Sequence, residues 1–327
     1  MMRAAYIEEI GPPENIRLGD LPRPRIGPTD VLVDVDVTTV NPVDTFVRSG
    51  LYRTPMPLPF VIGRDLVGRV AACGEGVAGF STGDRVWCNS LGHGGRQGAA
   101  AQQATVPADR LYRLPPGVDP DDAVGVLHPA ATAALALFQH AQARPGETVL
   151  VAGAAGNVGS ALVRIATQAG MRVIATARAA DAEYCRMLGA SDVVDYRDSA
   201  VGERLGAMCP GGVDVVVDTS GVNDLTAAVD LLAFRGRIVV LSGPHAQPVL
   251  PVGSLYMKDG SVTGFAISHA TIAELAEAAR MINRLLARGV LRPRSVERVS
   301  LGDAVDAHLR MERGELHGKR LVMHVPS

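Results

Sequence analysis

Residues 148–170 read TVLVAGAAGNVGSALVRIATQAG, and this stretch decides the fold of the chain. It begins with Thr148–Ala152, a short apolar run with β-branched residues, which is typical of a buried strand. A glycine-rich turn follows, and apolar side chains then recur at helical spacing. A second apolar run, Met171–Ala175, comes next. The stretch therefore predicts strand, turn, helix and strand, the first half of a dinucleotide-binding unit.

The glycines of the turn indicate what the unit binds. Gly153, Gly156 and Gly159 allow a sharp reversal, a close approach of a pyrophosphate to the backbone, and close packing of helix on strand. The phosphate is then held by the free N–H groups and positive end of the helix. Because these glycines lie between a strand and a helix, we interpret them as a cofactor site rather than an ordinary turn. Asn157 and Val158 in the same turn are also predicted to bind the cofactor.

Composition limits the class of protein. The 327 residues are 47% hydrophobic, which is enough for a large core and for two domains. The net charge of -2 comes from mixed charges without a basic stripe, so we expect no nucleic-acid partner. No run is long and apolar enough to cross a membrane, and the first residues lack a signal-peptide pattern. The four cysteines form no CxxC pair, which favours a reduced, cytoplasmic protein.

The pattern of predicted elements changes along the chain. Residues 1–122 carry short strands such as Asp30–Val37, separated by glycine and proline turns. Residues 123–266 alternate strands with helices, which predicts an α/β domain with a doubly wound parallel sheet. Residues 267–327 hold one amphipathic helix, Thr271–Arg288, and a terminal strand. Since this tail is too small for a domain, we expect it to join residues 1–122 in one discontinuous, mostly β domain.

The expected elements of the middle section follow its apolar runs. The predicted helices are Ala123–Ala143, Ala180–Leu188, Gly202–Met208 and Leu225–Phe234. Beyond the organising stretch, the predicted strands are Val213–Asp218, Arg237–Leu241 and Val262–Ala266.

Short motifs along the whole chain carry a family resemblance. They are Asn41-Pro42-Val43-Asp44, Gly63-Arg64-Asp65, Gly83-Asp84-Arg85-Val86, Ala131-Thr132-Ala133, the glycine turn, Leu188-Gly189-Ala190 with Tyr196, and Gly318-Lys319. With these motifs the chain resembles the zinc-free quinone oxidoreductases, the zeta-crystallin-like branch of the medium-chain dehydrogenase/reductase superfamily. The resemblance implies a Rossmann cofactor domain and a GroES-like catalytic domain. It also implies an NADPH-dependent, zinc-independent reductase of quinones or α,β-unsaturated carbonyl compounds.

The resemblance also bears on metal binding. Zinc relatives place a cysteine where Asn41 stands and a histidine where Arg64 stands, and neither ligand is present. The cysteine-rich structural zinc lobe is also missing, because residues 86–106 contain only Cys88. Zinc sites need about three or four protein ligands. We therefore predict no metal, and interpret His93 as a surface-loop residue rather than a ligand.

Two residues are predicted to be catalytic because of the resemblance. In the resembled reductases, the equivalents of Asn41 and Tyr52 lie by the nicotinamide and hydrogen-bond a carbonyl or quinone oxygen. Each side chain can donate such a bond, and Tyr52 could deliver a proton. The alternatives are a turn residue before Pro42 and a packed aromatic ring. Asp44 and Asp65 are expected to support the site through local hydrogen bonds.

The end of the second strand of the unit predicts which nicotinamide cofactor is used. An acidic residue there would bind the ribose hydroxyls of NADH. No acid occupies Ala175–Ala179, and Arg178 offers a guanidinium suited to the extra phosphate of NADPH. By the resemblance, Tyr196 packs by the same phosphate. The alternative for Arg178 is a solvated charge at the start of a helix.

The remaining predicted cofactor contacts come from several segments. Ser220 and Ser242-Gly243 follow strands at their C-terminal ends, where ligands bind in open α/β sheets. By the resemblance, Thr132 lies near the nicotinamide, the alternative being an ordinary helical threonine, and Gly264-Phe265 places backbone groups by the carboxamide. Lys319 either reaches a phosphate or lies on the surface.

The chain is also expected to form a homodimer, and two alternative functions remain open. The resemblance implies a homodimer in which Val262–Ala266 pairs with its copy, removing an exposed sheet edge. A non-enzymatic NADPH-binding protein, structural or RNA-binding, is one alternative function. A zinc alcohol dehydrogenase is another. The expected small-molecule partner is a quinone or an enone.

Overall fold

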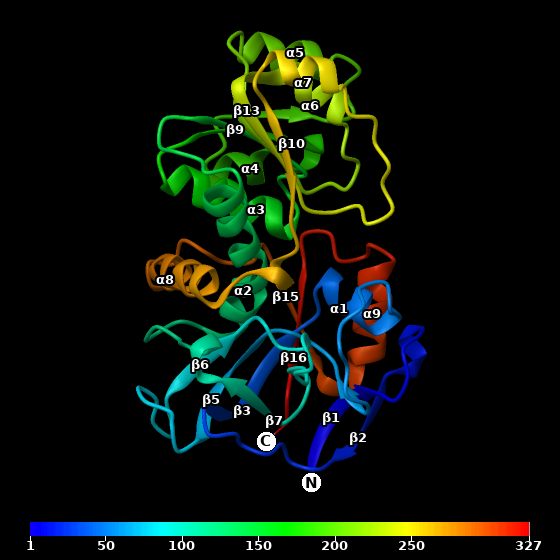
Figure 1. Ribbon diagram of the computed structural model, residues 1–327, viewed down its shortest axis with the longest axis vertical. Coiled ribbons are helices and arrows are strands. Elements are labelled where there is room, and N and C mark those ends of the chain that lie inside the picture. The colour runs from blue at the N-terminus through cyan, green and yellow to red at the C-terminus, as the bar shows by residue number, and fades with distance from the viewer. Residues whose placement is uncertain (327) are drawn as a thin grey trace. The chain divides into compact units, whose positions relative to one another are not determined.

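The computed structural model describes residues 1–326, and the chain divides into two compact units (Figure 1). Unit 1 comprises Met1–His128 and the segment from Thr271 onward. Unit 2 comprises Pro129–Ala270. The chain first passes from unit 1 to unit 2 inside α2 (Pro120–Ala134), a few residues after the expected boundary at 122. It returns directly after η5 (Ile267–His269).

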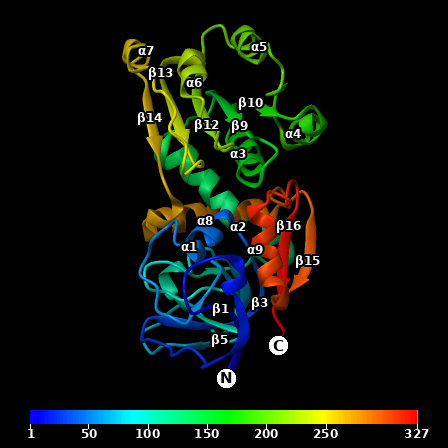
Figure 2. The same cartoon turned by 90° about the vertical axis from the view of Figure 1, so that its right-hand side faces the viewer.

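Unit 2 is built on a six-stranded parallel sheet, so the expected α/β fold with a doubly wound sheet is confirmed. The strand order is β11-β10-β9-β12-β13-β14. Figure 2 labels β9, β10, β12, β13 and β14 of this sheet. The strands are β9 (Thr148–Ala152), β10 (Arg172–Ala177), β11 (Asp192–Asp195), β12 (Val213–Asp218), β13 (Leu232–Val240) and β14 (Ser261–Gly264). The order reverses between β9 and β12, which is where such sheets bind ligands.

The helices of unit 2 follow the strands as alternating crossovers. They are α3 (Asn157–Gln168), α4 (Ala182–Leu188), α5 (Val201–Met208), α6 (Leu225–Leu231) and α7 (Val252–Met257). The expected helix 123–143 is α2 followed by a π-helical segment, η3 (Leu135–His140).

One predicted helix end is wrong. The helix expected to reach Phe234 ends at Leu231, and β13 begins at the next residue. Leu232 adopts an extended backbone, pairs with Val213 of β12 and is only 3% exposed. Its apolar side chain is therefore buried by the sheet rather than by a further helical turn.

Unit 1 contains two sheets and is mostly β. The first sheet has the order β2-β1-β4, and the second has the order β15-β16-β3-β5-β6-β8 with β7 also paired to β3. The first sheet comprises β1 (Met2–Ile7), β2 (Arg17–Leu21) and β4 (Phe60–Val61). The second comprises β3 (Asp30–Thr39), β5 (Leu66–Cys73), β6 (Arg85–Cys88), β7 (Gln103–Pro107), β8 (Tyr112–Arg113), β15 (Val296–Ser300) and β16 (Arg320–His324). The C-terminal β16 pairs with β3, which places residues from both ends of the chain in one core.

The helices of unit 1 are α1 (Pro42–Ser49), α8 (Ile272–Ala287) and α9 (Ala304–Glu312). Thr271 caps α8 through reciprocal hydrogen bonds with Glu274, as a capping box requires. The short 3-10 turns of unit 1 are η1 (Pro13–Asn15), η2 (Ala108–Arg110) and η6 (Leu301–Asp303), whereas η4 (Ala179–Asp181) lies in unit 2. Within residues 1–326, every helix is too short or too polar to span a membrane.

Candidate active site

The glycine turn of unit 2 forms a tight cradle between β9 and α3. Gly153 has a φ of +77°, and a Cβ atom there would lie 2.8 Å from Thr219 Oγ1. A Cβ atom on Gly159 would lie 2.2 Å from the carbonyl oxygen of Gly153. Gly156 is the extended N-cap of α3, so Asn157 and Val158 begin the helix. Residues larger than glycine are therefore excluded at positions 153 and 159. The N–H groups in the first turn of α3 have no partners within the helix and lie beside the cradle.

The loops after β12 and β13 are joined beside the cradle. Asp218 accepts hydrogen bonds from Ser220 N and Oγ, both at 2.7 Å, and from Asn223 N at 2.9 Å. Asn223 Nδ2 donates to the carbonyl oxygen of Ser242 at 2.9 Å. A Cβ atom on Gly243 would lie 2.6 Å from the carbonyl oxygen of residue 221. The predicted Ser220 and Ser242-Gly243 therefore lie together, held by Asn223, which the sequence analysis missed.

Arg178 and Tyr196 meet at the surface of unit 2 although 18 positions separate them. Arg178 Nε donates to the Tyr196 hydroxyl at 3.2 Å, and this hydrogen bond lowers the pKa of the Tyr196 hydroxyl. The Arg197 guanidinium lies 5.7 Å from the centre of the Tyr196 ring. Asp195 accepts hydrogen bonds from the backbone N–H groups of Ala179 and Arg197, which joins the two loops. Two guanidinium groups thus flank one tyrosine, and Arg197 was not predicted.

Three other predicted cofactor residues lie in different surroundings. Thr132 lies on α2 and is 9% exposed. The Phe265 ring stacks on His140, with 4.0 Å between the ring centres. Lys319 belongs to unit 1, where its Nζ lies 3.5 Å from Glu297. Its side chain is 52% exposed, so in this structure Lys319 is a surface residue paired with Glu297.

Asn41 occupies a buried position in unit 1, two residues after β3 ends, and is the N-cap of α1. Its side chain is 1% exposed. Nδ2 donates to Asp65 Oδ2 at 3.0 Å, and Oδ1 accepts from Arg320 at 2.9 Å. Its backbone N–H donates to Asp44 Oδ2 at 2.7 Å. Since Nδ2 carries two hydrogens, one N–H is left after these contacts.

The charges around Asn41 nearly balance one another. Asp44, Arg64, Asp65 and Arg320 are all buried, and Arg64 Nε lies 4.0 Å from Asp44 Oδ1. Burial raises the pKa of Asp44 to about 6, although Arg64 opposes this rise. Burial also lowers the pKa of both guanidinium groups. His128 Nδ1 lies 3.6 Å from Asp65 Oδ1. Asp44 and Asp65 thus hold Asn41 in place through hydrogen bonds, which is the local role expected of them.

Asn41 and Arg64 are poorly suited to bind a metal ion. A guanidinium such as that of Arg64 has only donors, and the oxygen of Asn41 already accepts from Arg320. Among residues 1–326, no three or more histidine, cysteine, aspartate or glutamate side chains are grouped to hold a metal ion.

Tyr52 lies in the loop after α1 and is half-buried. Its backbone N–H donates to the carbonyl oxygen of Phe46 at 3.0 Å. The rings of Tyr52 and His93 are 5.8 Å apart and tilted by 44°. His93 Nδ1 also lies 3.1 Å from Thr54 Oγ1. His93, which the sequence analysis placed on a surface loop without a role, therefore stands beside a predicted catalytic residue.

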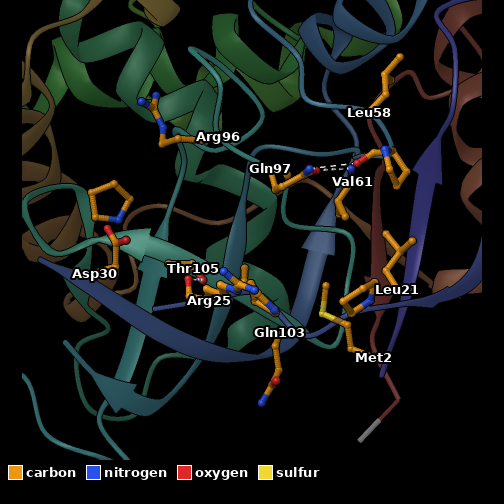
Figure 3. A pocket seen from close by; sticks show the side chains of 16 residues that line it. Met2, Leu21, Arg25, Asp30, Leu58, Val61, Arg96, Gln97, Gln103 and Thr105 are labelled. Carbon is orange, nitrogen blue, oxygen red and sulfur yellow. Dashed lines mark hydrogen bonds between the residues drawn. The ribbon is translucent and has the colours of Figure 1, made fainter. Parts of the chain in front are cut away.

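A separate pocket of about 460 Å³ lies on unit 1 (Figure 3). Prolines and apolar side chains form much of its wall, together with Arg25, Arg96, Gln97 and Gln103. The amide group of Gln97 is already engaged by the protein. Its Oε1 accepts a hydrogen bond from Val61 N at 2.6 Å, and its Nε2 donates to the carbonyl oxygens of Pro57 and Pro59. None of the predicted site residues lines this pocket.

Comparison with known families gives two matches. Residues 27–116 match the family described as "Alcohol dehydrogenase GroES-like domain". Residues 157–284 match the family described as "Zinc-binding dehydrogenase". The first match falls within the N-terminal part of unit 1, and the second begins at α3 of unit 2 and continues into α8.

Individual relatives match nearly the whole chain. The quinone oxidoreductase of Mus musculus is 32% identical over 94% of this chain and 93% of its own length. The quinone oxidoreductase of Homo sapiens is 29% identical over 96% of this chain and 95% of its own. A solved mycobacterial quinone oxidoreductase has a TM-score of 0.86 at 31% identity, covering 99% of this chain and 100% of its own. A mycobacterial protein solved in complex with NADPH has a TM-score of 0.85 at 30% identity, with the same coverage.

Proposed function

The chain belongs to the zeta-crystallin-like quinone oxidoreductase branch of the medium-chain dehydrogenases/reductases, and we propose that it reduces quinones or α,β-unsaturated carbonyl compounds with NADPH, without zinc. The observation that carries the proposal is the glycine cradle with the Arg178–Tyr196 pair at the end of the neighbouring strand. The named relatives and the NADPH complex of a mycobacterial neighbour support the same reading.

The residues of unit 2 fit NADPH. Side chains at Gly153 and Gly159 would clash with the cradle itself, so the backbone is kept open for a pyrophosphate. Arg178 is exposed at the end of β10, where a guanidinium can pair with the extra phosphate. When bound, NADPH supplies a hydride equivalent for the reduction. Thr132, Phe265 and the joined Ser220 and Ser242-Gly243 loops are the proposed contacts of the riboside and nicotinamide.

Asn41 and Tyr52 are the proposed groups that polarise the acceptor. One amide hydrogen of Asn41 is held by Asp65, and its oxygen is held by Arg320, so the second amide hydrogen has a fixed direction. Tyr52 offers a hydroxyl donor from the neighbouring loop. Hydrogen-bond donors stabilise developing negative charge on an oxygen, but less strongly than a metal ion would. Acceptors that are already electrophilic, such as quinones and enones, therefore suit this site best.

Zinc independence rests on the chemistry of two positions. Asn41 and Arg64 stand where the zinc relatives carry ligands, and a guanidinium has no lone pair to offer. The Asn41 amide is already engaged on both sides. A zinc alcohol dehydrogenase is therefore the weaker alternative.

A homodimer is part of the proposal. β14 ends the six-stranded sheet of unit 2, and an edge strand presents unpaired backbone groups. Large exposed apolar side chains accompany it: Phe234 is 65% exposed, Tyr256 76% and Met257 74%. Figure 2 shows α7, which carries Tyr256 and Met257, near the ends of β13 and β14. A second copy would cover both the edge and these side chains.

A cytoplasmic location is also proposed, because none of the four cysteines forms a disulfide in the described part of the chain.

Absorbance of NADPH at 340 nm in the presence of 1,4-benzoquinone or an enone tests the function. Oxidation that depends on both protein and acceptor is the expected result. Binding of NADPH without any turnover over a panel of quinones and enones would favour the non-enzymatic alternative. No binding of either nicotinamide cofactor would overturn the proposal.

A further inference from the structure

One buried residue, Asn223, joins the loops that follow β12 and β13. The residue is only 5% exposed, and its Nδ2 donates to the carbonyl oxygens of Ser242 at 2.9 Å and of Gly221 at 3.4 Å. Its backbone N–H donates to Asp218 Oδ2 at 2.9 Å. Asn223 therefore fixes the loop after β13 to the last residue of β12, through its side chain on one side and its backbone on the other.

Glycines let the two loops approach closely at this junction. Gly221 and Gly243 both have left-handed backbones, with φ of +80° and +79°. A Cβ atom on Gly243 would lie 2.6 Å from the carbonyl oxygen of Gly221 and 2.7 Å from Nδ2 of Asn223. Asn223 itself has a φ of +54°, which asparagine adopts more readily than most residues. The backbone of both loops is thus shaped around the amide of Asn223.

The hydrogen bonds that this amide donates account for its presence. Oδ1 of Asn223 is buried and has no hydrogen-bond partner among residues 1–326. A buried acceptor without a partner costs free energy, and a residue without a side-chain oxygen would avoid that cost. Such a residue would also remove the donor that holds the carbonyl oxygen of Ser242. The junction between the loops is therefore what asparagine supplies at this position.

The sheet places this junction on the side of the cofactor that carries the nicotinamide. The proposed phosphate contacts are the cradle after β9 and Arg178 at the end of β10. β12 lies on the opposite side of β9 from β10. Because a dinucleotide crosses such a sheet where the strand order reverses, its other half extends towards β12 and β13. The loop after β12 reaches the cradle, since a Cβ atom on Gly153 would lie 3.2 Å from Ser220 N.

We propose that Asn223 is a positioning residue for the nicotinamide riboside of NADPH; this rests on the proposed function. It acts through Ser220 and Ser242, whose loops it holds in one arrangement. Loops that are already ordered lose less conformational freedom when a ligand binds, so the affinity is higher. The contribution of Asn223 is confined to the nicotinamide half of the cofactor, whereas Arg178 acts on the adenosine half.

Two ligands separate the halves of the cofactor. NADPH contains both halves, whereas adenosine 2′,5′-bisphosphate contains only the half with the extra phosphate. In Asn223→Asp the left-handed backbone stays accessible, but no N–H faces the carbonyl oxygen of Ser242. We expect the Kd for NADPH to rise about tenfold, the scale of one lost hydrogen bond, and the Kd for adenosine 2′,5′-bisphosphate to stay the same. Asn223→Gly, which also permits this backbone, should show the same split.

Calorimetric titration of the full-length protein without an acceptor measures both Kd values. Asp224→Asn is the matched control, because an amide oxygen can still cap α6 as Asp224 Oδ1 does, and it should change neither value. Arg178→Ala should weaken the binding of both ligands. An unchanged Kd for NADPH in the two Asn223 variants, or an equal loss of affinity for both ligands, would overturn the assignment. Since no turnover is needed, a protein that binds NADPH but reduces no quinone would contradict only the proposed function.

Discussion

Arg320 donates a hydrogen bond to Oδ1 of Asn41 at 2.9 Å, although 279 positions separate the two residues. Arg320 also donates to Thr39 Oγ1 at 3.2 Å. Thr39 is the last residue of β3, Asn41 follows two residues later, and Arg320 begins β16, the strand that pairs with β3. The C-terminal strand thereby sets the orientation of the amide that we propose polarises the acceptor.

Replacement of Arg320 should destabilise the protein and reduce turnover together. Arg320→Gln removes a buried charged donor and leaves Asp44 and Asp65 with less compensating charge. We expect a loss of about 1.5–3 kcal/mol in the free energy of unfolding, the usual scale of a hydrogen bond to a charged group. Urea denaturation measures the free energy of unfolding, and kcat should be lower than in the unmodified protein. Arg292→Gln, at a side chain that is 68% exposed, is the control. Equal effects of the two substitutions would contradict the positioning role.

Arg178 should decide between the two nicotinamide cofactors. One charge-assisted contact contributes roughly 1.5–3 kcal/mol, or about a tenfold to hundredfold preference. Arg178→Ala should raise the KM for NADPH by that factor and leave the KM for NADH nearly unchanged. Arg186→Ala, another exposed arginine of unit 2, should alter neither. Equal use of both cofactors by the unmodified protein would show that the phosphate is not recognised here.

His308 should make the protein less stable in acid. Burial, aided by the nearby Arg48, lowers the pKa of His308 from 6.5 to about 3. The unfolded chain therefore binds more protons than the folded protein between these values, and stability falls as the pH drops from 6.5 towards 3. The slope is at most about 1.4 kcal/mol per pH unit. Asp44 acts in the opposite sense between its ordinary 3.8 and about 6, because its folded pKa is raised.

The free energy of unfolding in urea at pH 7 and pH 5 measures this effect. His308→Leu should flatten the loss of stability on acidification, whereas His324→Leu, at a half-exposed side chain, should not. Parallel curves for the unmodified protein and His308→Leu would mean that His308 does not remain neutral when folded.

Assembly through β14 should depend on a backbone donor. Thr263→Pro removes the N–H of a residue in the middle of this edge strand and should weaken the dimer. Thr263→Val keeps the N–H and should leave the dimer intact. Light scattering at micromolar concentration should give twice the chain mass of 34.2 kDa for the unmodified protein. The chain mass itself under those conditions would rule out the dimer.

Local patterns in the sequence predict much of this fold but only part of the site. The strand 148–152, the glycine turn and the helix after it follow from neighbouring residues, because each depends on backbone conformation and spacing. Val213–Asp218 is predicted with the bounds that β12 has. The end of the helix at Leu231 was missed because burial of Leu232 depends on its pairing with Val213.

The missed site residues all act through contacts that are distant in sequence. Arg320 meets Asn41 only because β16 pairs with β3. His93 meets Thr54 and Tyr52 because two loops 39 positions apart are joined by hydrogen bonds. Asn223 joins the loops after β12 and β13 from a left-handed backbone conformation, with a φ of +54°. No local pattern marks these residues, since their roles arise from the tertiary arrangement.

The most direct test of the account is the rate of NADPH oxidation by 1,4-benzoquinone with the purified protein after exhaustive chelation, with zinc content measured on the same sample. Hydrogen-bond donors take the place of a metal at Asn41 and Arg64 in this account. It therefore predicts full activity with no stoichiometric zinc, and a clear preference for NADPH over NADH. Activity that is lost on chelation and restored by zinc would contradict it.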